Sequence, residues 1–346
     1  MKSSESRESG AVKREFGKYN LAVVLNENAK KVTPSVRAHI HELVPERNIY
    51  YSRSLEDSFR IAVTIVEKGY DAVFTGGGDG TVIQFFNDLV NTGATEFPAV
   101  GVFPLGTGNA VAEMVSSGSY LDDLESYVLR KQVDYQRLGL LESEGQVFPF
   151  AGLGFDAGII NDYMLLKKSL GKNRLMKPLL QSVGGYLMAT FGKTVPRTIS
   201  QAVTGTRSIV RLINLGERAF EADADGTPTR EYAKGELIYE GPSIMLAVAT
   251  APYLGYALKI FPNSLRHPGF FELRVVYGSV ARKVVNLGKI WKGHYVVDDA
   301  RSVMATRVRA EFDRDTPYQI GGDAQGYRRE VEFALSPAEL RLLRFI

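Results

Sequence analysis

Two glycine-rich loops that follow consecutive apolar strands most strongly constrain the fold of this 346-residue chain. The first unit is a short strand at residues 71–75 with an apolar centre, a loop at 76–81, and apolar residues at helical spacing over 82–89. The second unit is an apolar run at 99–103 followed by a loop at 104–109. Strand, loop and helix in succession are typical of a parallel α/β sheet. Because neighbouring loops at the carboxyl ends of such strands border one crevice, we expect both loops to face the same ligand.

The glycines of these loops predict a binding site for an anion, with phosphate as the expected guest. Glycine permits positive φ angles and lets a bulky anion approach the free N–H groups at a helix start. The first loop is neither a Walker A loop, since no Lys follows its last glycine, nor the GxGxxG dinucleotide fingerprint. The alternative for the first loop is a structural turn in which Asp79 or Thr81 caps the helix. The loop residues expected at the phosphates are Gly76, Gly77, Gly78, Gly80, Thr81, Gly106, Thr107, Gly108 and Asn109.

The paired loops resemble the signature of the superfamily of diacylglycerol kinases, sphingosine kinases and bacterial lipid kinases, with the NAD kinases as distant relatives. The matching residues are Gly77-Gly-Asp-Gly-Thr81 and Pro104-Leu-Gly-Thr-Gly-Asn109. Residues 24–30, 151–157 and 253–263 are similar to further family segments. The resemblance therefore extends from about Tyr19 to the C-terminus.

The resemblance implies an enzyme that transfers the γ-phosphate of ATP, with Mg²⁺, to a hydroxyl of a diacylglycerol-like or sphingoid-like lipid. It places Asn26, Ser52 and Thr107 against the nucleotide, although the family more often has Thr at the position of Ser52. Two other readings stay open. One is a non-catalytic nucleotide- or lipid-binding protein with the kinase fold, and the other is a soluble small-molecule kinase of the NAD-kinase type.

The catalytic candidates are two carboxylates and one amide. Asp79 is the only carboxylate within the two loops, so we expect it to hold Mg²⁺ through water or to orient the acceptor hydroxyl. By resemblance, Gln325 stands where the family has the Glu of an Asp-Gly-Glu segment, and an amide cannot act as a base. Asp323 is the nearest replacement, with Asp79 or Asp156 as alternatives. The other readings are that residues 321–323 form only a hairpin turn, or that the chain transfers phosphate poorly.

The pattern of predicted secondary structure changes near Val133, where alternating strands and helices are followed by short β-rich runs. We predict an α/β plus β fold, with an N-terminal doubly wound α/β nucleotide-binding domain and a C-terminal, mainly antiparallel domain. The resemblance makes the second domain a β-sandwich that receives the lipid and returns the chain's end to the first domain. The expected segments are a disordered tail at 1–17, the α/β domain at 18–135, the β-sandwich at 136–330 and the returning segment at 331–346.

Composition excludes several other classes of protein. The chain has no cysteine, so it has no disulfide framework, and its four histidines contain no HExxH zinc motif. Its N-terminus lacks the apolar core of a signal peptide. No uninterrupted apolar run reaches the roughly 18 residues that span a bilayer. We therefore expect a cytoplasmic protein, and the sequence leaves open whether it is a monomer or a homodimer.

A basic and apolar insertion at about 163–197 predicts peripheral association with an anionic membrane surface. No acidic residue occurs between Asp162 and Glu217, whereas nine Lys and Arg residues do. Leucines and methionines recur in the same segment, so its helices would present a cationic and an apolar face. The alternative is core helices with a basic polar face, and nucleic-acid binding is not expected because no aromatic-basic platform is present. The membrane-contact candidates are Lys167, Lys168, Lys172, Arg174 and Lys177.

Overall fold

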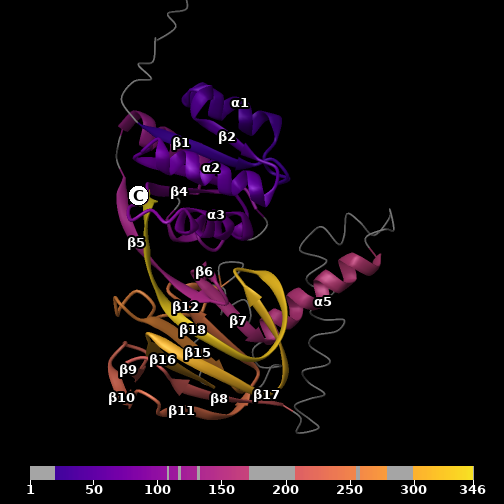
Figure 1. The fold of residues 1–346 in the computed structure, drawn as a ribbon, viewed down its shortest axis with the longest axis vertical. Helices are drawn as coiled ribbons and strands as arrows, with labels where there is room; N and C mark the ends of the chain where they lie inside the picture. The colour runs from indigo at the N-terminus through magenta and orange to yellow at the C-terminus, as the bar shows by residue number, and fades with distance from the viewer. Residues whose placement is uncertain are drawn as a thin grey trace, which may run out of the picture.

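The chain combines an α/β half with a β half, joined by two strands that extend from one half into the other (Figure 1). The computed structural model describes residues 20–106, 109–115, 118–130, 133–170, 207–254, 258–278 and 299–345. Within these residues, sixteen strands form one hydrogen-bonded sheet, and a further pair forms a small sheet of its own. No helix in the same residues is both long and apolar enough to cross a membrane.

The α/β half is built on four parallel strands in the order β4-β3-β1-β2. These strands are β1 (Leu21–Asn26), β2 (Ile49–Ser52), β3 (Ala72–Gly77) and β4 (Ala99–Pro104). The helices between and after them are α1 (Pro34–Leu43), α2 (Leu55–Glu67), α3 (Asp79–Asn91) and α4 (Tyr120–Glu125). Short helical turns occur at Glu46–Asn48, Ala112–Met114 and Ser126–Arg130.

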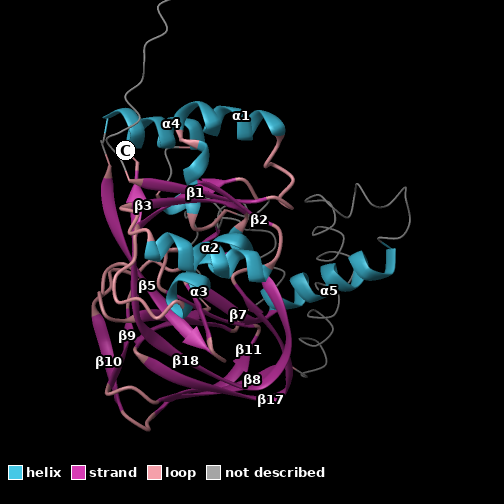
Figure 2. Cartoon of the chain, turned by 45° about the horizontal axis from the view of Figure 1, so that its top comes forward, coloured by secondary structure: helices cyan, strands magenta, loops and turns pink. Residues whose placement is uncertain are grey.

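Alternate side chains of β1 pack against helices on opposite faces of the sheet, as a period of two requires. Leu21, Val23 and Leu25 share a core with α1 and α4, whereas Ala22 and Val24 share another with α2 and α3. Figure 2 shows helices on both sides of these strands. This arrangement confirms the predicted doubly wound domain.

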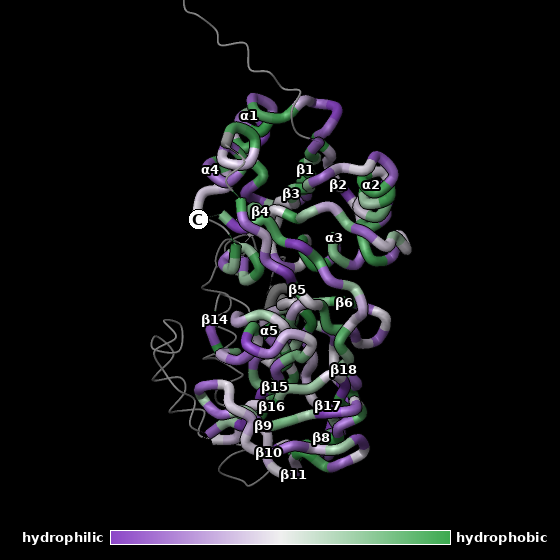
Figure 3. The backbone as a smooth tube through the Cα atoms, turned by 90° about the vertical axis from the view of Figure 1, so that its left-hand side faces the viewer, coloured by the Kyte–Doolittle hydropathy of each residue, from purple (hydrophilic) through white to green (hydrophobic). Residues whose placement is uncertain are grey.

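The helices of the α/β half begin with the caps that the sequence provides. Thr33 Oγ1 accepts a hydrogen bond from Val36 N (3.3 Å) at the start of α1, and Ser54 Oγ accepts one from Asp57 N (3.0 Å) at the start of α2. Gly69, with φ +63°, ends α2. Hydrophobic and hydrophilic residues alternate along α2 and α3 in Figure 3, because each helix has one buried and one exposed face.

Two helical segments of the α/β half are short. Residues 120–130 form α4 followed by a π-helical turn, Ser126–Arg130. The chain after the second glycine loop forms one 3₁₀ turn, Ala112–Met114. There the N–H groups of Met114 and Val115 bond three residues back, and a single such turn does not propagate into an α-helix.

The β half consists of two antiparallel layers around one core, as predicted for a β-sandwich. The first layer contains β9, β16, β15, β12 and β7, with β10 at its edge, and the second contains β11, β8, β5 and β6. The strands are β5 (Asp134–Ser143), β6 (Gln146–Phe148), β7 (Phe150–Gly154), β8 (Ser208–Asn214), β9 (Arg218–Ala222), β10 (Pro228–Ala233), β11 (Leu237–Ser243), β12 (Met245–Ala249), β13 (Tyr253–Leu254), β14 (Leu258–Lys259), β15 (Phe271–Val276), β16 (Ala300–Ala305), β17 (Arg307–Ile320) and β18 (Asp323–Arg344).

The last two strands tie these parts together. Residues 308–312 of β17 pair with β8, and residues 318–320 pair with β7, so β17 belongs to both layers. β18 leaves β17 by a tight turn, pairs with β5, and ends beside β4, where Leu342 lies opposite Val100 in parallel register. The described chain therefore ends in the α/β half (Figure 1). The tight turn brings the β half to the first turn of α3.

The packing of β3 on β4 predicts a strong effect of one methyl group. A Cβ at Gly101 would lie 2.4 Å from Phe74 Cδ1, on a ring stacked on Phe103. We expect Gly101→Ala to lower the free energy of unfolding by about 1–3 kcal/mol, because the buried ring cannot move without disturbing its neighbours. Urea unfolding would measure this.

Gly139→Ala is the matched control, since its Cβ would meet atoms no closer than 3.8 Å. We expect the control to change the same free energy by no more than about 0.5 kcal/mol. Equal effects of the two substitutions would contradict this account of the strand packing.

Candidate active site

A cavity of about 470 Å³ opens at the carboxyl ends of β1 and β2, in front of the first turn of α3. This is the end of a parallel sheet at which ligands bind in doubly wound folds. Most of its lining is polar and comes from the ends of β1 and β2, the start of α2, the start of α3 and the start of β18. The lining residues are Asn26, Asn28, Ser52, Arg53, Ser54, Leu55, Ser58, Gly80, Thr81, Gln84 and Asp323.

Side-chain amides fix the polar rim of this cavity. Asn26 Nδ2 donates to Thr81 Oγ1 (2.9 Å), which joins the end of β1 to the first turn of α3. Asn26 Oδ1 accepts from Asn28 N (2.9 Å), and Asn28 Nδ2 donates to Arg53 O (3.0 Å). The structure thus brings the predicted nucleotide residues Asn26, Ser52, Gly80 and Thr81 to one cavity.

The glycines of the first loop serve close packing rather than an unusual backbone conformation. We expected positive φ angles there, and this expectation is wrong, because Gly76, Gly77, Gly78 and Gly80 lie outside the left-handed region. A Cβ at Gly77 would lie 2.5 Å from Thr81 Cβ, and one at Gly80 would lie 2.6 Å from Asp323 Oδ2. Gly76 is equally close to Leu25. The absence of a side chain at Gly77 and Gly80 leaves room for Thr81 and Asp323 beside the backbone.

Asp79 links the two glycine loops. Gly78 occupies the N-cap position of α3 with no side-chain bond, so neither Asp79 nor Thr81 caps this helix. The buried Asp79 carboxylate, only 8% exposed, instead accepts a hydrogen bond from Val111 N (3.3 Å), just after the second loop. Burial, with a smaller contribution from the charge of Asp323, raises the pKa of Asp79 to about 6. Asp79 is not among the residues that line the cavity.

The described part of the second loop closes on itself. Asn109 Oδ1 accepts from Gly106 N (3.0 Å), and Asn109 Nδ2 donates to Gly106 O (3.3 Å). Gly106 and Asn109 are not among the lining residues of the cavity. The predicted phosphate contacts Thr107 and Gly108 lie outside the described residues. Of the two loops, only the first therefore contributes described residues to the cavity.

Asp323 reaches the cavity from the β half through the turn between β17 and β18. Gly321 and Gly322 have φ angles of +57° and +88°, which only glycine adopts easily, and they reverse the chain. A Cβ at Gly321 would lie 2.0 Å from Ile83 Cδ1, so this turn rests directly on α3. Surrounding protein atoms raise the pKa of Asp323, although part of the residue stays exposed to solvent.

The other two catalytic candidates, Gln325 and Asp156, lie outside the cavity. Gln325 does not line the cavity, and its backbone oxygen accepts from Arg328 Nη1 (3.0 Å). Asp156 lies in the first turn of α5 (Phe155–Leu170), where its buried carboxylate accepts from Gln319 Nε2 (3.0 Å), and burial of the carboxylate raises its pKa to about 6. Among the candidates for the missing Glu, Asp323 is the one that the structure brings to the cavity.

A second group of cavity residues was not predicted from the sequence. Asn28, Arg53, Ser54, Leu55, Ser58 and Gln84 also line the cavity. Buried Asp88 lies behind two of them, where it accepts from Ser58 Oγ (2.5 Å) and Gln84 Nε2 (2.8 Å). Arg53 and Ser54 directly follow β2, so the strand-end rule that identified the first loop would have found them as well.

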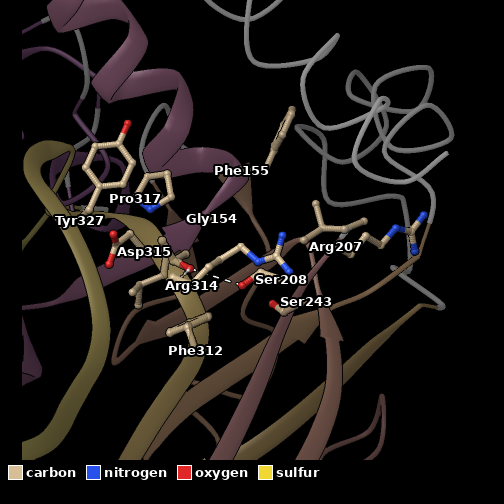
Figure 4. A pocket seen from close by; sticks show the side chains of 13 residues that line it. Gly154, Phe155, Arg207, Ser208, Ser243, Phe312, Arg314, Asp315, Pro317 and Tyr327 are labelled. Carbon is tan, nitrogen blue, oxygen red and sulfur yellow. Dashed lines mark hydrogen bonds between the residues drawn. The ribbon is translucent and has the colours of Figure 1, made fainter. Parts of the chain in front are cut away.

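A smaller cavity of about 250 Å³ lies in the β half, where β17 bends between the two layers (Figure 4). Its walls combine apolar side chains, such as Phe312 and Ile244, with the polar side chains of Ser208 and Arg314. Gly154 and Phe155, at the start of α5, also line it. This cavity therefore lies at the root of α5.

The predicted membrane segment is described only at its start. α5 projects away from the body of the protein (Figure 1), and the side chains of Met164 and Leu165 are about half exposed on it, at 48% and 50%. Lys167 and Lys168 lie on the same helix, but their side chains are not described. Lys172, Arg174 and Lys177 lie outside the described residues.

Because Asp79 is buried, we expect its replacement by Asn to stabilise the protein in a pH-dependent way. Folding raises the pKa of Asp79 from 3.8 to about 6, so the folded protein binds this proton more tightly than the unfolded chain does. Ionisation of Asp79 therefore destabilises the fold as the pH rises through this window. Asn can still accept from Val111 N. We expect Asp79→Asn to raise the free energy of unfolding by up to about 3 kcal/mol at pH 8 and hardly at all at pH 4. Urea unfolding in EDTA across this range would measure the difference.

Comparison with known proteins identifies the domain that holds the large cavity. Residues 20–139 match the model of the diacylglycerol kinase catalytic domain. A "Probable lipid kinase YegS-like" of Enterobacter sp. (strain 638) is 39% identical over 56 residues, which are 16% of this chain and 19% of that protein. A "Probable lipid kinase YegS" of Escherichia coli O127:H6 (strain E2348/69 / EPEC) is 35% identical over 66 residues, 19% and 22% of the two chains. The matched segments thus span about a fifth of each relative.

The whole fold is shared with solved structures. Two structures from Bacillus anthracis str. Sterne, whose names place them among the diacylglycerol kinases, align with TM-scores of 0.63 and 0.56 at 15% and 13% identity. The alignments cover 94% and 95% of this chain and 95% and 98% of theirs. At such identities the likeness establishes the fold alone. The family match thus shows that residues 20–139 are similar to the diacylglycerol kinase catalytic domain, and the shared fold extends over the rest of the chain.

Proposed function

We propose that this chain is a lipid kinase that transfers the γ-phosphate of ATP to a hydroxyl of a diacylglycerol-like or sphingoid-like lipid. One observation carries the proposal: the cavity at the first turn of α3 has a carboxylate, Asp323, at its edge. The cavity supplies a place for the donor phosphates, and the carboxylate supplies a proton acceptor. Phosphoryl transfer requires both.

The polar lining of the cavity suits a nucleotide. The N-terminal end of α3, at Gly80 and Thr81, carries N–H groups and the positive end of the helix dipole, which favour phosphate oxygens. Asn26, which is bonded to Thr81, and Ser52 add hydrogen-bonding groups at the ends of β1 and β2. Arg53 adds a cation, now paired with Glu27 (2.5 Å), that can turn toward phosphate because its side chain is exposed. A nucleotide in this cavity would thus meet donors from three elements.

The residues present also fit Mg²⁺ held in the manner common to kinases. No cluster of three or more metal-binding side chains occurs among the described residues. Mg²⁺ in such sites needs only one or two carboxylates, completed by substrate phosphates and water. Asp323 is the one acidic side chain among the described lining residues, and Asp79 lies behind them, where it would act through water. When bound, the ion would neutralise charge on the phosphates.

Asp323 is the proposed general base. As the lipid hydroxyl oxygen attacks the γ-phosphorus, its proton passes to the Asp323 carboxylate, and ADP leaves. The raised pKa of Asp323 makes it a better proton acceptor than an ordinary Asp, provided that it is ionised at the working pH. Gln325 has no basic atom for this step. The carboxylate that replaces the family's Glu thus comes from two positions earlier in the sequence.

The lipid would approach from the β half. The smaller cavity at the bend of β17 offers apolar walls for part of an acyl chain. α5 begins beside this cavity and carries exposed Met164 and Leu165 at the start of the basic segment at about 163–197. We propose that this segment contacts an anionic membrane and that α5 lies close to the point where the lipid enters.

The prediction of kinase activity is tested through the carboxylate of Asp323. We expect purified protein with Mg²⁺ and γ-³²P-labelled ATP to label one lipid of a panel of diacylglycerol, monoacylglycerol, sphingosine, ceramide and phosphatidylglycerol. Asp323→Asn should lower kcat at least about 100-fold, because the amide cannot take the proton. Its nucleotide affinity, measured by calorimetry, should stay within a few fold.

Asp134→Asn, at an exposed carboxylate that does not line the cavity, is the control and should transfer phosphate normally. NAD is assayed beside the lipids, and label in NAD alone would favour a small-molecule kinase. Intact nucleotide binding with no labelled product would favour a binding protein that kept the fold.

The membrane prediction concerns the basic segment. We expect Gln at Lys167, Lys168, Lys172 and Arg174 together to weaken co-sedimentation with phosphatidylglycerol-containing vesicles at least about tenfold at low salt, since each cation near anionic headgroups contributes on the order of 1 kcal/mol. The difference should shrink in 0.5 M salt through screening. The control variant removes four exposed cations of the α/β half, Lys30, Lys31, Arg47 and Lys68. Equal weakening by both variants would show that only the net charge matters.

A further inference from the structure

A chain of partly buried hydrogen bonds leads from α5 to the turn that carries Asp323. Gln319 Nε2 donates to Asp156 Oδ2 (3.0 Å), and Gln319 Oε1 accepts from Gly322 N (2.7 Å). The Gln319 side chain is only 1% exposed. One amide therefore bridges a buried carboxylate and the backbone directly before Asp323.

The neighbouring strand leaves room for this bridge. Gly152 on β7 lies opposite Gln319 in the register between β7 and β17. A Cβ at Gly152 would lie 2.0 Å from Asp156 Oδ2 and 2.9 Å from Gln319 Nε2. Any side chain larger than hydrogen would separate the two groups. The backbone thus allows Asp156, four residues further along the chain, to fold back onto Gln319.

The turn is held at three points. Gly321 N donates to Phe150 O (3.0 Å), Gly322 N donates to Gln319, and the backbone at Gly321 rests on Ile83 of α3. Two successive glycines in left-handed conformations would by themselves leave this turn free to adopt other shapes. Of the three contacts, the bond to Gln319 is the one next to Asp323. It therefore has the most direct effect on where the carboxylate lies.

We propose that Gln319 and Asp156 are positioning residues, which hold the Gly321–Gly322 turn so that the Asp323 carboxylate stays against Gly80 at the edge of the cavity. This inference rests on the proposed function of Asp323. An amide is suited to the task because one end must accept from Gly322 N while the other donates to a carboxylate. Asp156 keeps the amide oriented, because an ionised carboxylate accepts hydrogen bonds and cannot donate them.

The test exchanges the donor and the acceptor across the pair. In Gln319→Glu, two carboxylates face each other in a buried site, so we expect the turn to shift and kcat to fall at least about 30-fold, with KM for ATP within threefold. Asp156→Asn keeps an acceptor for Gln319 Nε2 but can also donate, so it no longer fixes which end of the Gln319 amide faces it, and we expect kcat to fall by about 3- to 10-fold. In the double variant, the amide introduced at position 156 can donate to the carboxylate introduced at position 319, which can still accept from Gly322 N. We expect its kcat to recover to within about fivefold of wild type.

A second readout does not depend on transfer. Amide hydrogen exchange of a peptide that spans residues 319–326 should quicken at least tenfold in Gln319→Glu and return to the wild-type rate in the double variant. Gln319→Met removes both bonds without adding charge, so it should quicken exchange and lower kcat even if the Gln319→Glu variant fails to fold. If the wild type transfers no phosphate, the exchange data alone still decide whether the bridge holds the turn.

The outcomes that overturn the proposal are distinct from failure of the kinase assignment. Normal kcat and slow exchange in Gln319→Met would show that the bridge does not position Asp323. A double variant no better than Gln319→Glu would show that Gln319 and Asp156 act separately. Loss of kcat in proportion to a lowered melting temperature, with slow exchange below that temperature, would indicate a role in stability only.

Discussion

The close approach of the β17–β18 turn to the first turn of α3 is the contact on which the rest of the site depends. It is possible only because Gly80 and Gly321 lack a Cβ: one would strike Asp323, and the other would strike Ile83. Through this contact, a strand turn from the β half completes a cavity that otherwise belongs to the α/β half. The site therefore exists only when both halves are folded and correctly placed, and β18, which pairs in both halves, fixes that placement.

Buried carboxylates organise the backbone around this contact. Burying a charge is unfavourable unless hydrogen bonds compensate for the lost water. Asp79 bonds the backbone after the second glycine loop, and Asp156 bonds Gln319, which holds the turn before Asp323. Asp88 in the same way holds Ser58 and Gln84 at the wall of the cavity. Each buried acid thus orders a different part of the polar surface that a nucleotide would meet.

Much of the fold could be predicted because local periodicity and tertiary structure agree. The strands and helices of the α/β half follow from alternating apolar residues, caps such as Thr33 and Ser54, and the terminating Gly69. The site was predicted in part. Asn26, Ser52, Gly80 and Thr81 line the cavity as expected, whereas Asp79 does not, since nothing in its local sequence shows that its carboxylate turns inward to Val111.

The sequence by itself determined the order of elements, the two kinds of domain and the first glycine-rich loop, because these depend on residues close together in the chain. Only the tertiary structure decided which acid reaches the cavity. Asp79 and Asp323 are far apart in sequence, and their roles depend on a hairpin turn packed on a helix start. The tertiary structure also paired Asp156 with Gln319. Such contacts arise when strands distant in sequence come into register, and no local pattern encodes them.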